Sequence, residues 1–330
     1  MQDPSTAFQE RFQRLKDEVG KVVVGQEQVV EDVLVALAAN GHVLLEGVPG
    51  LGKTLLVRSL AQALRLDFSR VQFTPDLMPA DILGTHLLVE DGQGGRALEF
   101  RKGPVFTQIL LADEINRATP KTQSALLEAM AEGSVTTAGT PHRLPRPFFV
   151  LATQNPLEME GTYPLPEAQL DRFFSKVVVP FPTLEELGTI IDRTTGDENP
   201  EAQPVLDAED LLDMQRTVRR VLLAEPVKHY ALSIVLGTHP TGPGATGAAS
   251  RLLRYGASPR GAQAIILGAR VRALLAGRPQ VGFDDVSASA MPALRHRVLL
   301  NFEAEGAGLT SEQVVEQVLA EVPRPHGASV

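Results

Sequence analysis

The chain has 330 residues, of which 43% are hydrophobic and 22% are charged, a composition ordinary for a globular protein long enough to form two domains. It contains no cysteine, which excludes a disulfide framework and a zinc site built on thiolates. The formal net charge of -9 argues against an all-over electrostatic grip on nucleic acid. Because the sequence shows neither a basic and then apolar leader nor an apolar run of about 18 residues, we expect a soluble, cytoplasmic protein with no membrane segment of its own.

The most specific pattern in the chain is a phosphate-binding loop. An apolar strand predicted at 42–45 leads into Gly47-Val48-Pro49-Gly50-Leu51-Gly52-Lys53-Thr54, which fits G-x-x-x-x-G-K-[ST], and a helix is predicted over 53–66. The glycines let backbone N–H groups surround phosphates, Lys53 reaches the outer phosphates, and the Thr54 hydroxyl can bind Mg²⁺. The pattern and its context predict a nucleoside triphosphate site rather than a chance glycine turn.

Short apolar runs follow the loop, with helical patterns or connections between most of them. They lie at 71–73, 109–112, 148–152 and 177–179. This alternation predicts a mainly parallel sheet covered on both faces. Residues 86–90 and 97–101 flank a turn-rich stretch, which predicts a β-hairpin inserted at about 85–102 between two core strands. The hairpin could be an exposed working loop.

Two adjacent acids end the predicted strand at 109–112. In a parallel sheet this strand end lies beside the phosphate loop, and strand alternation sends the side chains of Asp113 and Glu114 in different directions. Asp113 can therefore hold the magnesium shell while Glu114 meets the water that attacks the γ-phosphate. Asn155, after the strand at 148–152, opens onto the same side and could orient that water or sense the γ-phosphate. The alternative for Asn155 is a turn-forming residue before proline.

The second half of the chain is predicted to be helical. Thr183 and Glu186 make a capping box for a helix through about residue 193, and no convincing buried strand follows. A polar connector at 194–206 then separates an expected domain at 1–193 from one at 207–330. Helices are predicted at 208–223, 228–236, 260–276 and 283–299. The stretch 238–250, rich in glycine and proline, is expected to be a flexible surface loop.

Positive charge is concentrated in the second half. Residues 226–300 include nine basic and two acidic residues, a balance of +7. This segment could face an acidic part of a neighbouring subunit or a bound phosphate, or it could be a solvated basic face. His296, between two arginines, is expected on such a solvated helix face. The seven histidines include no helical pair at metal-ligand spacing, so we predict no zinc site.

Long motifs occur in a fixed order from about residue 23 to residue 300. They are the phosphate loop, DEINRA at 113–118, ATQNP at 152–156, LPEAQLDRF at 165–173 and GASPR at 256–260, with shorter runs at 73–77 and 127–130. Together they resemble the MoxR family of AAA+ ATPases. The resemblance implies an α/β fold of the AAA+ P-loop NTPase type: a parallel five-stranded sheet between helices, a β-hairpin insert, and then an all-helical lid domain.

The resemblance also implies roles for single residues. By this similarity Asn155 is the first sensor, Arg172 is the arginine finger offered to a neighbouring subunit's ATP, and Arg260 is the lid sensor that contacts phosphate. Gly25 and Gln26 resemble the segment beside the adenine. Subunits of such proteins assemble into a ring, usually a hexamer, and an arginine supplied across an interface stabilises transition-state charge. Ordinary surface salt bridges are the alternative for both arginines, and the subunit that Arg260 serves stays open.

Three functions are compatible with these residues. The resemblance implies a chaperone-like ATPase, using ATP and Mg²⁺, that remodels or activates a client enzyme, commonly with a partner bearing a von Willebrand factor A domain. A nucleic-acid motor or loader is the second possibility, supported only by the basic segment; the net charge and the few aromatic residues argue against nucleic acid as a partner. The third is a nucleotide-dependent assembly scaffold, which needs the same site as the first.

Overall fold

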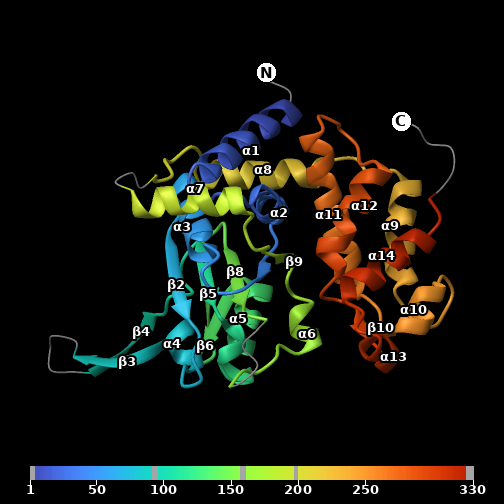
Figure 1. Cartoon of the computed structure of the whole chain (residues 1–330). Coiled ribbons are helices and arrows are strands. Elements are labelled where there is room, and N and C mark those ends of the chain that lie inside the picture. Colours follow the sequence, from blue (N-terminus) through green and yellow to red (C-terminus); the bar gives the residue numbers. More distant parts are fainter. Residues whose placement is uncertain (1–3, 91–95, 157–160, 197–199, 325–330) are drawn as a thin grey trace.

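The computed structural model describes residues 4–90, 96–156, 161–196 and 200–324. A sheet covered by helices lies beside a cluster of helices formed by the C-terminal part of the chain (Figure 1). The helices of the first part are α1 (Pro4–Gly20), α2 (Glu27–Ala38), α3 (Lys53–Ala63), α4 (Pro79–Leu83), η1 (Ile115–Arg117), α5 (Pro120–Glu132), α6 (Glu167–Leu170) and α7 (Leu184–Thr195). Its strands are β1 (Val43–Glu46), β2 (Phe68–Gln72), β3 (Gly84–Glu90), β4 (Arg96–Lys102), β5 (Ile109–Asp113), β6 (Ser134–Thr137), β7 (Thr140–Arg143), β8 (Phe149–Gln154) and β9 (Ser175–Val178).

The second part of the chain, here named the lid, is mainly helical. It contains α8 (Ala208–Arg220), α9 (Glu225–Gly237), α10 (Gly247–Leu252), β10 (Leu253–Tyr255), α11 (Pro259–Leu275), α12 (Phe283–Leu294), β11 (Leu299–Leu300), α13 (Phe302–Gly306) and α14 (Ser311–Glu321). The antiparallel pair β10 and β11 is a small addition that the sequence pattern does not predict. The expected flexible loop is wrong in its last part, because α10 begins at Gly247 and the buried Thr246 hydroxyl accepts a hydrogen bond from the Ala249 N–H.

The predicted five-stranded parallel sheet is confirmed, with strand order β2-β5-β8-β1-β9. All five residues of β5 are buried, as expected for a parallel strand with helices on both sheet faces. Since every strand runs the same way, the loops that follow β1, β5 and β8 share one edge, here named the carboxyl edge. The loops that precede β1, β8 and β9 share the opposite one, here named the amino edge.

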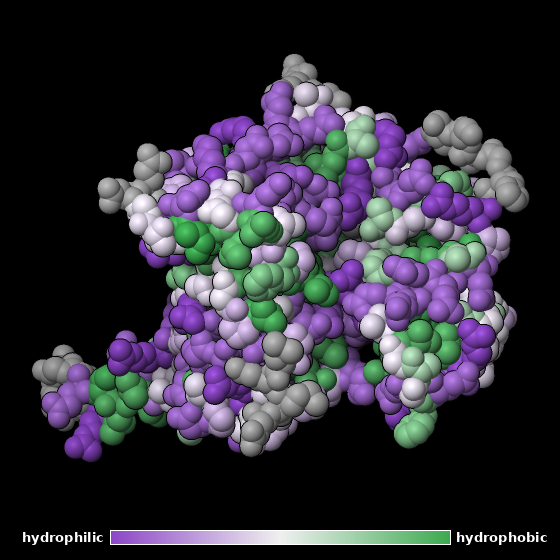
Figure 2. Space-filling view, viewed as in Figure 1, coloured by the Kyte–Doolittle hydropathy of each residue, from purple (hydrophilic) through white to green (hydrophobic). Residues whose placement is uncertain are grey.

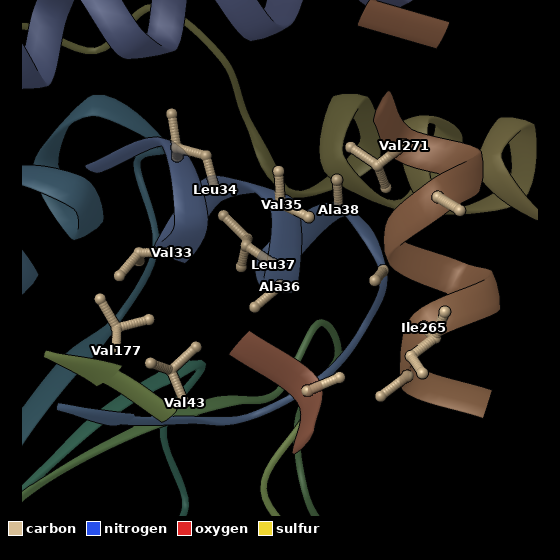
Figure 3. Close-up of a cluster of buried hydrophobic side chains, with 14 of the residues drawn as sticks. Val33, Leu34, Val35, Ala36, Leu37, Ala38, Val43, Val177, Ile265 and Val271 are labelled. Atoms are coloured by element: carbon tan, nitrogen blue, oxygen red, sulfur yellow. The ribbon is translucent and has the colours of Figure 1, made fainter. Parts of the chain in front are cut away.

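Helix α2 joins the sheet to the lid. Its residues from Val33 to Ala38 are all buried, and a helix that is apolar on every side must be covered on every side. Figure 3 shows these side chains between Val43 and Val177 of the sheet and Ile265 and Val271 of α11. The sheet and the lid therefore share one hydrophobic core. The described end of the connector, residues 200–206, also packs onto the first part, where Val205 and Leu206 donate to the Ala63 carbonyl.

The predicted hairpin insert is present as β3 and β4, which pair antiparallel from Gly84 with Lys102 to Glu90 with Arg96. It projects from the body of the molecule (Figure 1). The predicted turn falls largely on residues 91–95, which lie outside the described residues. Leu88 and Leu98, paired across the strands, are 59% and 71% exposed, and the hairpin carries apolar surface (Figure 2). Exposed apolar surface of this kind suits contact with another protein.

A half-buried histidine connects β8 and the end of α5 at the amino edge. His42 precedes β1; its Nδ1 accepts from the Val150 N–H at 3.0 Å, and its Nε2 lies 3.2 Å from the Met130 carbonyl oxygen. These two contacts suit a neutral ring that carries its proton on Nε2. Burial lowers the pKa of His42 from 6.5 to about 4.

This histidine makes stability depend on pH. Below pH 6.5 the unfolded chain binds a proton at His42 that the native ring does not bind. The contribution of His42 to the free energy of unfolding is therefore fully present above pH 6.5 and is lost as the pH falls toward 4. In His42→Asn, the loss of unfolding free energy between pH 7 and pH 5 should be smaller than in the wild type by about 2 kcal/mol. Urea titrations at the two pH values measure it. His229→Asn, at an exposed position on α9, is the control and should lose as much as the wild type; an equal loss in His42→Asn would contradict the assignment.

Candidate functional site

The phosphate loop follows β1 at the carboxyl edge and has the backbone shape that phosphate binding needs. Gly50 and Gly52 have φ angles of 84° and 74°, in the left-handed region that favours glycine. A Cβ on Gly47 would lie 3.0 Å from the Val179 Cβ, which ties the loop to the end of β9. Successive N–H groups in such a loop, together with the N-terminus of α3, form a site for anions.

Lys53, the first residue of α3, points into this loop. Its Nζ donates to the carbonyls of Gly47 and Val48. Burial lowers the pKa of Lys53, and the charges of Asp113 and Glu114 oppose that fall. The ammonium group therefore sits between the loop carbonyls and the acids of β5, where an oxygen of a phosphate could replace the carbonyl partners.

The two predicted acids lie beside the loop and are fixed by one hydroxyl. Asp113 is 8% exposed, and its Oδ1 accepts from the Thr153 hydroxyl at 2.6 Å. The same hydroxyl oxygen accepts from the Glu114 N–H at 2.8 Å. Thr153 lies on β8, the strand that pairs with β5. A single side chain thus sets the positions of both acids relative to the next strand.

Glu114 is held in an uncommon conformation. Its φ of 55° places a non-glycine residue in the left-handed region, which such residues adopt infrequently and at a cost in energy. Its Oε2 accepts from Gln72 Nε2 at 2.7 Å and from Arg117 Nη1 at 2.9 Å. Arg70 pairs with Asp113 in the same way, its Nη2 lying 2.7 Å from Oδ2. Both carboxylates therefore have charged partners from β2 and η1.

The remaining predicted residues of this edge lie around the loop. Asn155 follows β8 and is 5% exposed. Gln26 Nε2 donates to the Leu51 carbonyl at 2.8 Å, which fixes the segment before α2 to the phosphate loop. Gly25 has a φ of 70°, and a Cβ there would lie 2.4 Å from the Glu186 carboxyl carbon. The positive φ favours glycine at this position, where the Glu186 side chain of α7 approaches the backbone, and both residues lie beside the loop.

The two predicted arginines lie at the other edge of the sheet. Arg172 precedes β9, and the nearby Phe174 N–H donates to the His42 carbonyl just before β1. The Arg172 Nη1 donates to the Leu127 carbonyl at 2.9 Å. Arg260 lies in the first turn of α11, and its Nη1 is 3.3 Å from Asp171 Oδ2. Both arginines line a cavity of about 510 Å³ at the amino edge, so the fold does not bring them to the phosphate loop of their own chain.

The basic lid segment is largely paired within the chain. The pairs are Lys228–Glu225, Arg260–Asp171, Arg272–Asp32, Arg278–Asp285, Arg295–Glu312 and Arg297–Asp171. The expectation that His296 lies on a solvated helix face is wrong: it is 7% exposed, and its Nε2 lies 3.2 Å from the Phe173 carbonyl oxygen. Burial lowers the pKa of His296 well below 6.5.

Sequence reasoning missed the partners that hold these side chains. Arg70, Gln72 and Thr153 come from neighbouring strands, and their contacts with the acids depend on strand order and register. Thr153 could have been found, because it belongs to the ATQNP motif at 152–156, directly before Gln154 and Asn155. Arg297 carries no local signal for its role, since all its hydrogen-bond partners except the Ala293 carbonyl lie more than a hundred residues away.

The chain matches known families over most of the described core and lid. Residues 42–175 match the ATPase family associated with various cellular activities (AAA), and residues 246–318 match the AAA lid domain. Chaperone MoxR1 of Mycobacterium tuberculosis is 44% identical over 308 residues, covering 93% of this chain and 81% of that protein. The uncharacterized protein YeaC of Bacillus subtilis is 43% identical over 312 residues, covering 94% and 93%.

More distant relatives and a solved structure agree with this match. Protein MoxR of Methylorubrum extorquens is 33% identical over 341 residues, covering 97% of each chain. A crystal structure from Cytophaga hutchinsonii matches with a TM-score of 0.89 at 40% identity, covering 98% of this chain and 97% of that chain. The predicted fold, with its parallel sheet and helical lid, is therefore confirmed.

Thr153→Val tests the shared hydroxyl. The substitution keeps the shape of the side chain but leaves an oxygen of the buried Asp113 and the Glu114 N–H without their partner. We expect the free energy of unfolding to fall by about 1–3 kcal/mol, measured by chemical denaturation. Thr189→Val, at an exposed position of α7, is the control and should change stability by less than about 0.5 kcal/mol. Equal effects of the two substitutions would contradict the role assigned to Thr153.

Proposed function

Because the chain belongs to the MoxR family of AAA+ ATPases, we propose that it binds ATP with Mg²⁺ and hydrolyses it in a ring of subunits, six by family resemblance, to remodel or activate other proteins. One observation carries the proposal. The residues that could bind and cleave ATP gather at the carboxyl edge, whereas Arg172 and Arg260 lie at the amino edge, where only another subunit's nucleotide could meet them.

The carboxyl edge has the groups that phosphoryl transfer to water needs. The loop N–H groups and Lys53 would hold the phosphates, and Glu114 would accept a proton from the attacking water. Thr54 and Asp113 offer the oxygen ligands that Mg²⁺ prefers, and the bound ion would neutralise charge on the phosphate oxygens. Among the described residues, no three His, Asp or Glu side chains are grouped to hold a metal by themselves. In the proposed site, oxygens of the bound phosphates would supply the other ligands of the ion. Asn155 would orient the water.

The amino edge would complete the site of a neighbour. A guanidinium placed against the γ-phosphate stabilises the charge of the transition state and is typically worth about 10³-fold or more in rate. Arg260 shares an edge, a cavity and the neighbouring Asp171 with Arg172. These shared features support the proposal that both arginines serve the same neighbouring nucleotide.

The work of the ring would be done on proteins. The hairpin of β3 and β4 offers exposed leucines, which suit a protein surface, and one relative of this chain is named a chaperone. A von Willebrand factor A domain partner and a client enzyme follow from the family resemblance. The basic lid segment, on which a nucleic-acid motor rested, has most of its charge paired inside the chain. No helix of the described residues is long and apolar enough to cross a membrane.

Glu114→Gln tests the chemistry and the client together. The variant should bind ATP normally while turnover falls by at least about 10²-fold, because the water loses its proton acceptor. The bound ATP should then hold the ring on its client during affinity capture from native lysate. Lys53→Ala is the control, because it should bind no ATP and retain nothing in an ATP-dependent way.

The outcomes of this experiment separate the proposed functions. A protein retained only with ATP supports remodelling and names the client. Wild-type turnover in Glu114→Gln would contradict the assigned mechanism, and retention of nuclease-sensitive nucleic acid would favour the motor.

Arg172→Ala tests the contribution of the amino edge. Turnover per subunit should fall by about 10³-fold or more, with little change in the affinity for ATP, because the arginine stabilises charge that develops in the transition state. Phosphate release and the binding of a fluorescent ATP analogue measure the two quantities. Arg216→Ala, which removes an arginine that is 56% exposed and paired on the surface of α8, should leave turnover within twofold. A similar loss in both variants would count against a role for Arg172 in the reaction.

A further inference from the structure

A buried arginine of the lid donates hydrogen bonds to the backbone on both sides of Arg172. Arg297 follows α12, and its side chain is 2% exposed. Its Nη2 donates to the carbonyls of Asp171 at 3.1 Å and Phe173 at 2.5 Å. Its Nη1 donates to the Phe174 carbonyl at 3.1 Å. The conformation of the segment that carries Arg172 therefore depends on a side chain from the other domain.

The Asp171 carboxylate makes the reciprocal contacts. It accepts from Arg297 Nε at 2.9 Å and from the Ser258 hydroxyl, which lies 2.8 Å from each carboxylate oxygen. Ser258 is the N-cap of α11, and its oxygen also accepts from the Arg260 N–H at 3.1 Å. Asp171 thus fixes the start of the helix that carries Arg260. One carboxylate and one guanidinium connect the backbones that bear both arginines.

Arg297 and Arg260 both pair with Asp171, but the pair with Arg297 is buried and the pair with Arg260 is partly exposed. Burial lowers the pKa of Arg297, and the hydrogen bond and charge of Asp171 oppose the fall. Arg260, in contrast, is 51% exposed and lies 3.3 Å from the carboxylate, so it can exchange Asp171 for a phosphate. When Arg260 leaves, Arg297 still neutralises Asp171, and no buried charge is left unpaired.

Building on the proposed function, we propose that Asp171 and Arg297 are positioning residues that lock the lid to the segment before β9. Through them, Arg172 from the sheet domain and Arg260 from the lid are presented to a neighbour's nucleotide as one fixed pair. Neither positioning residue touches that nucleotide. Their removal should therefore impair the subunit that supplies the arginines and spare the subunit that supplies the site.

Mixed rings separate these two subunits. An Arg172→Ala/Arg260→Ala protein supplies an intact ATP site without arginines, and a Glu114→Gln protein supplies arginines without hydrolysis. Each alone should stay at background, and their mixture should turn over ATP. Asp171→Asn, which keeps the shape and one acceptor oxygen, is then introduced into either parent, and turnover and KM for ATP are measured in each mixture.

We expect Asp171→Asn to lower turnover by about 10- to 100-fold, with KM for ATP unchanged, only when it is in the parent that supplies the arginines. In the other parent the effect should stay within twofold. Asp285→Asn in the arginine-supplying parent is the matched control, because it weakens a lid ion pair with Arg278, at 2.7 Å, that makes no contact with Asp171. That control mixture should keep its turnover within twofold.

Two results would overturn the inference. An equal loss in both placements would show that Asp171 only maintains folding or assembly, and no loss in the arginine-supplying parent would show that the lock is not needed. An inactive mixture of the unmodified parents would instead overturn the proposed function, and the inference with it.

Discussion

The direction of the parallel sheet is the constraint on which the rest of the structure depends. Because β1 and β9 run the same way side by side, the loop after β1 and the segment before β9 must lie at opposite edges. The phosphate loop takes the first position and Arg172 takes the second. No side-chain rotation could bring them together within one chain, and the proposed function therefore assigns Arg172 to the nucleotide of a second subunit.

The shared hydrophobic core connects the lid to the sheet. Helix α2 is covered by the sheet on one side and by α11 on the other, so the same buried side chains contact both parts (Figure 3). The buried contacts of Arg297 add direction to that packing, because hydrogen bonds fix orientation where apolar contacts do not. The amino edge thus carries two arginines that line one cavity, and the carboxyl edge carries the glycine-rich loop.

The sequence predicts what is local and misses what depends on tertiary contacts. The phosphate loop, Asp113 and Glu114 stand in short motifs beside apolar strands, so the sheet and the carboxyl edge of the site could be inferred before the structure. Gln72 and Arg70 could not, because their contacts with these acids follow from strand order. His296 was expected in solvent because its neighbours are charged. In the structure it is buried beside Arg297, whose charge is neutralised by Asp171.

The central claim is that each nucleotide is served by the arginines of another subunit. The most direct measurement is an experimental structure of the assembled Glu114→Gln protein with ATP and Mg²⁺. The account predicts that the Arg172 and Arg260 guanidinium groups of one subunit contact the γ-phosphate bound to the phosphate loop of the next. A γ-phosphate contacted by the arginines of its own chain, or by neither arginine of any chain, would contradict it.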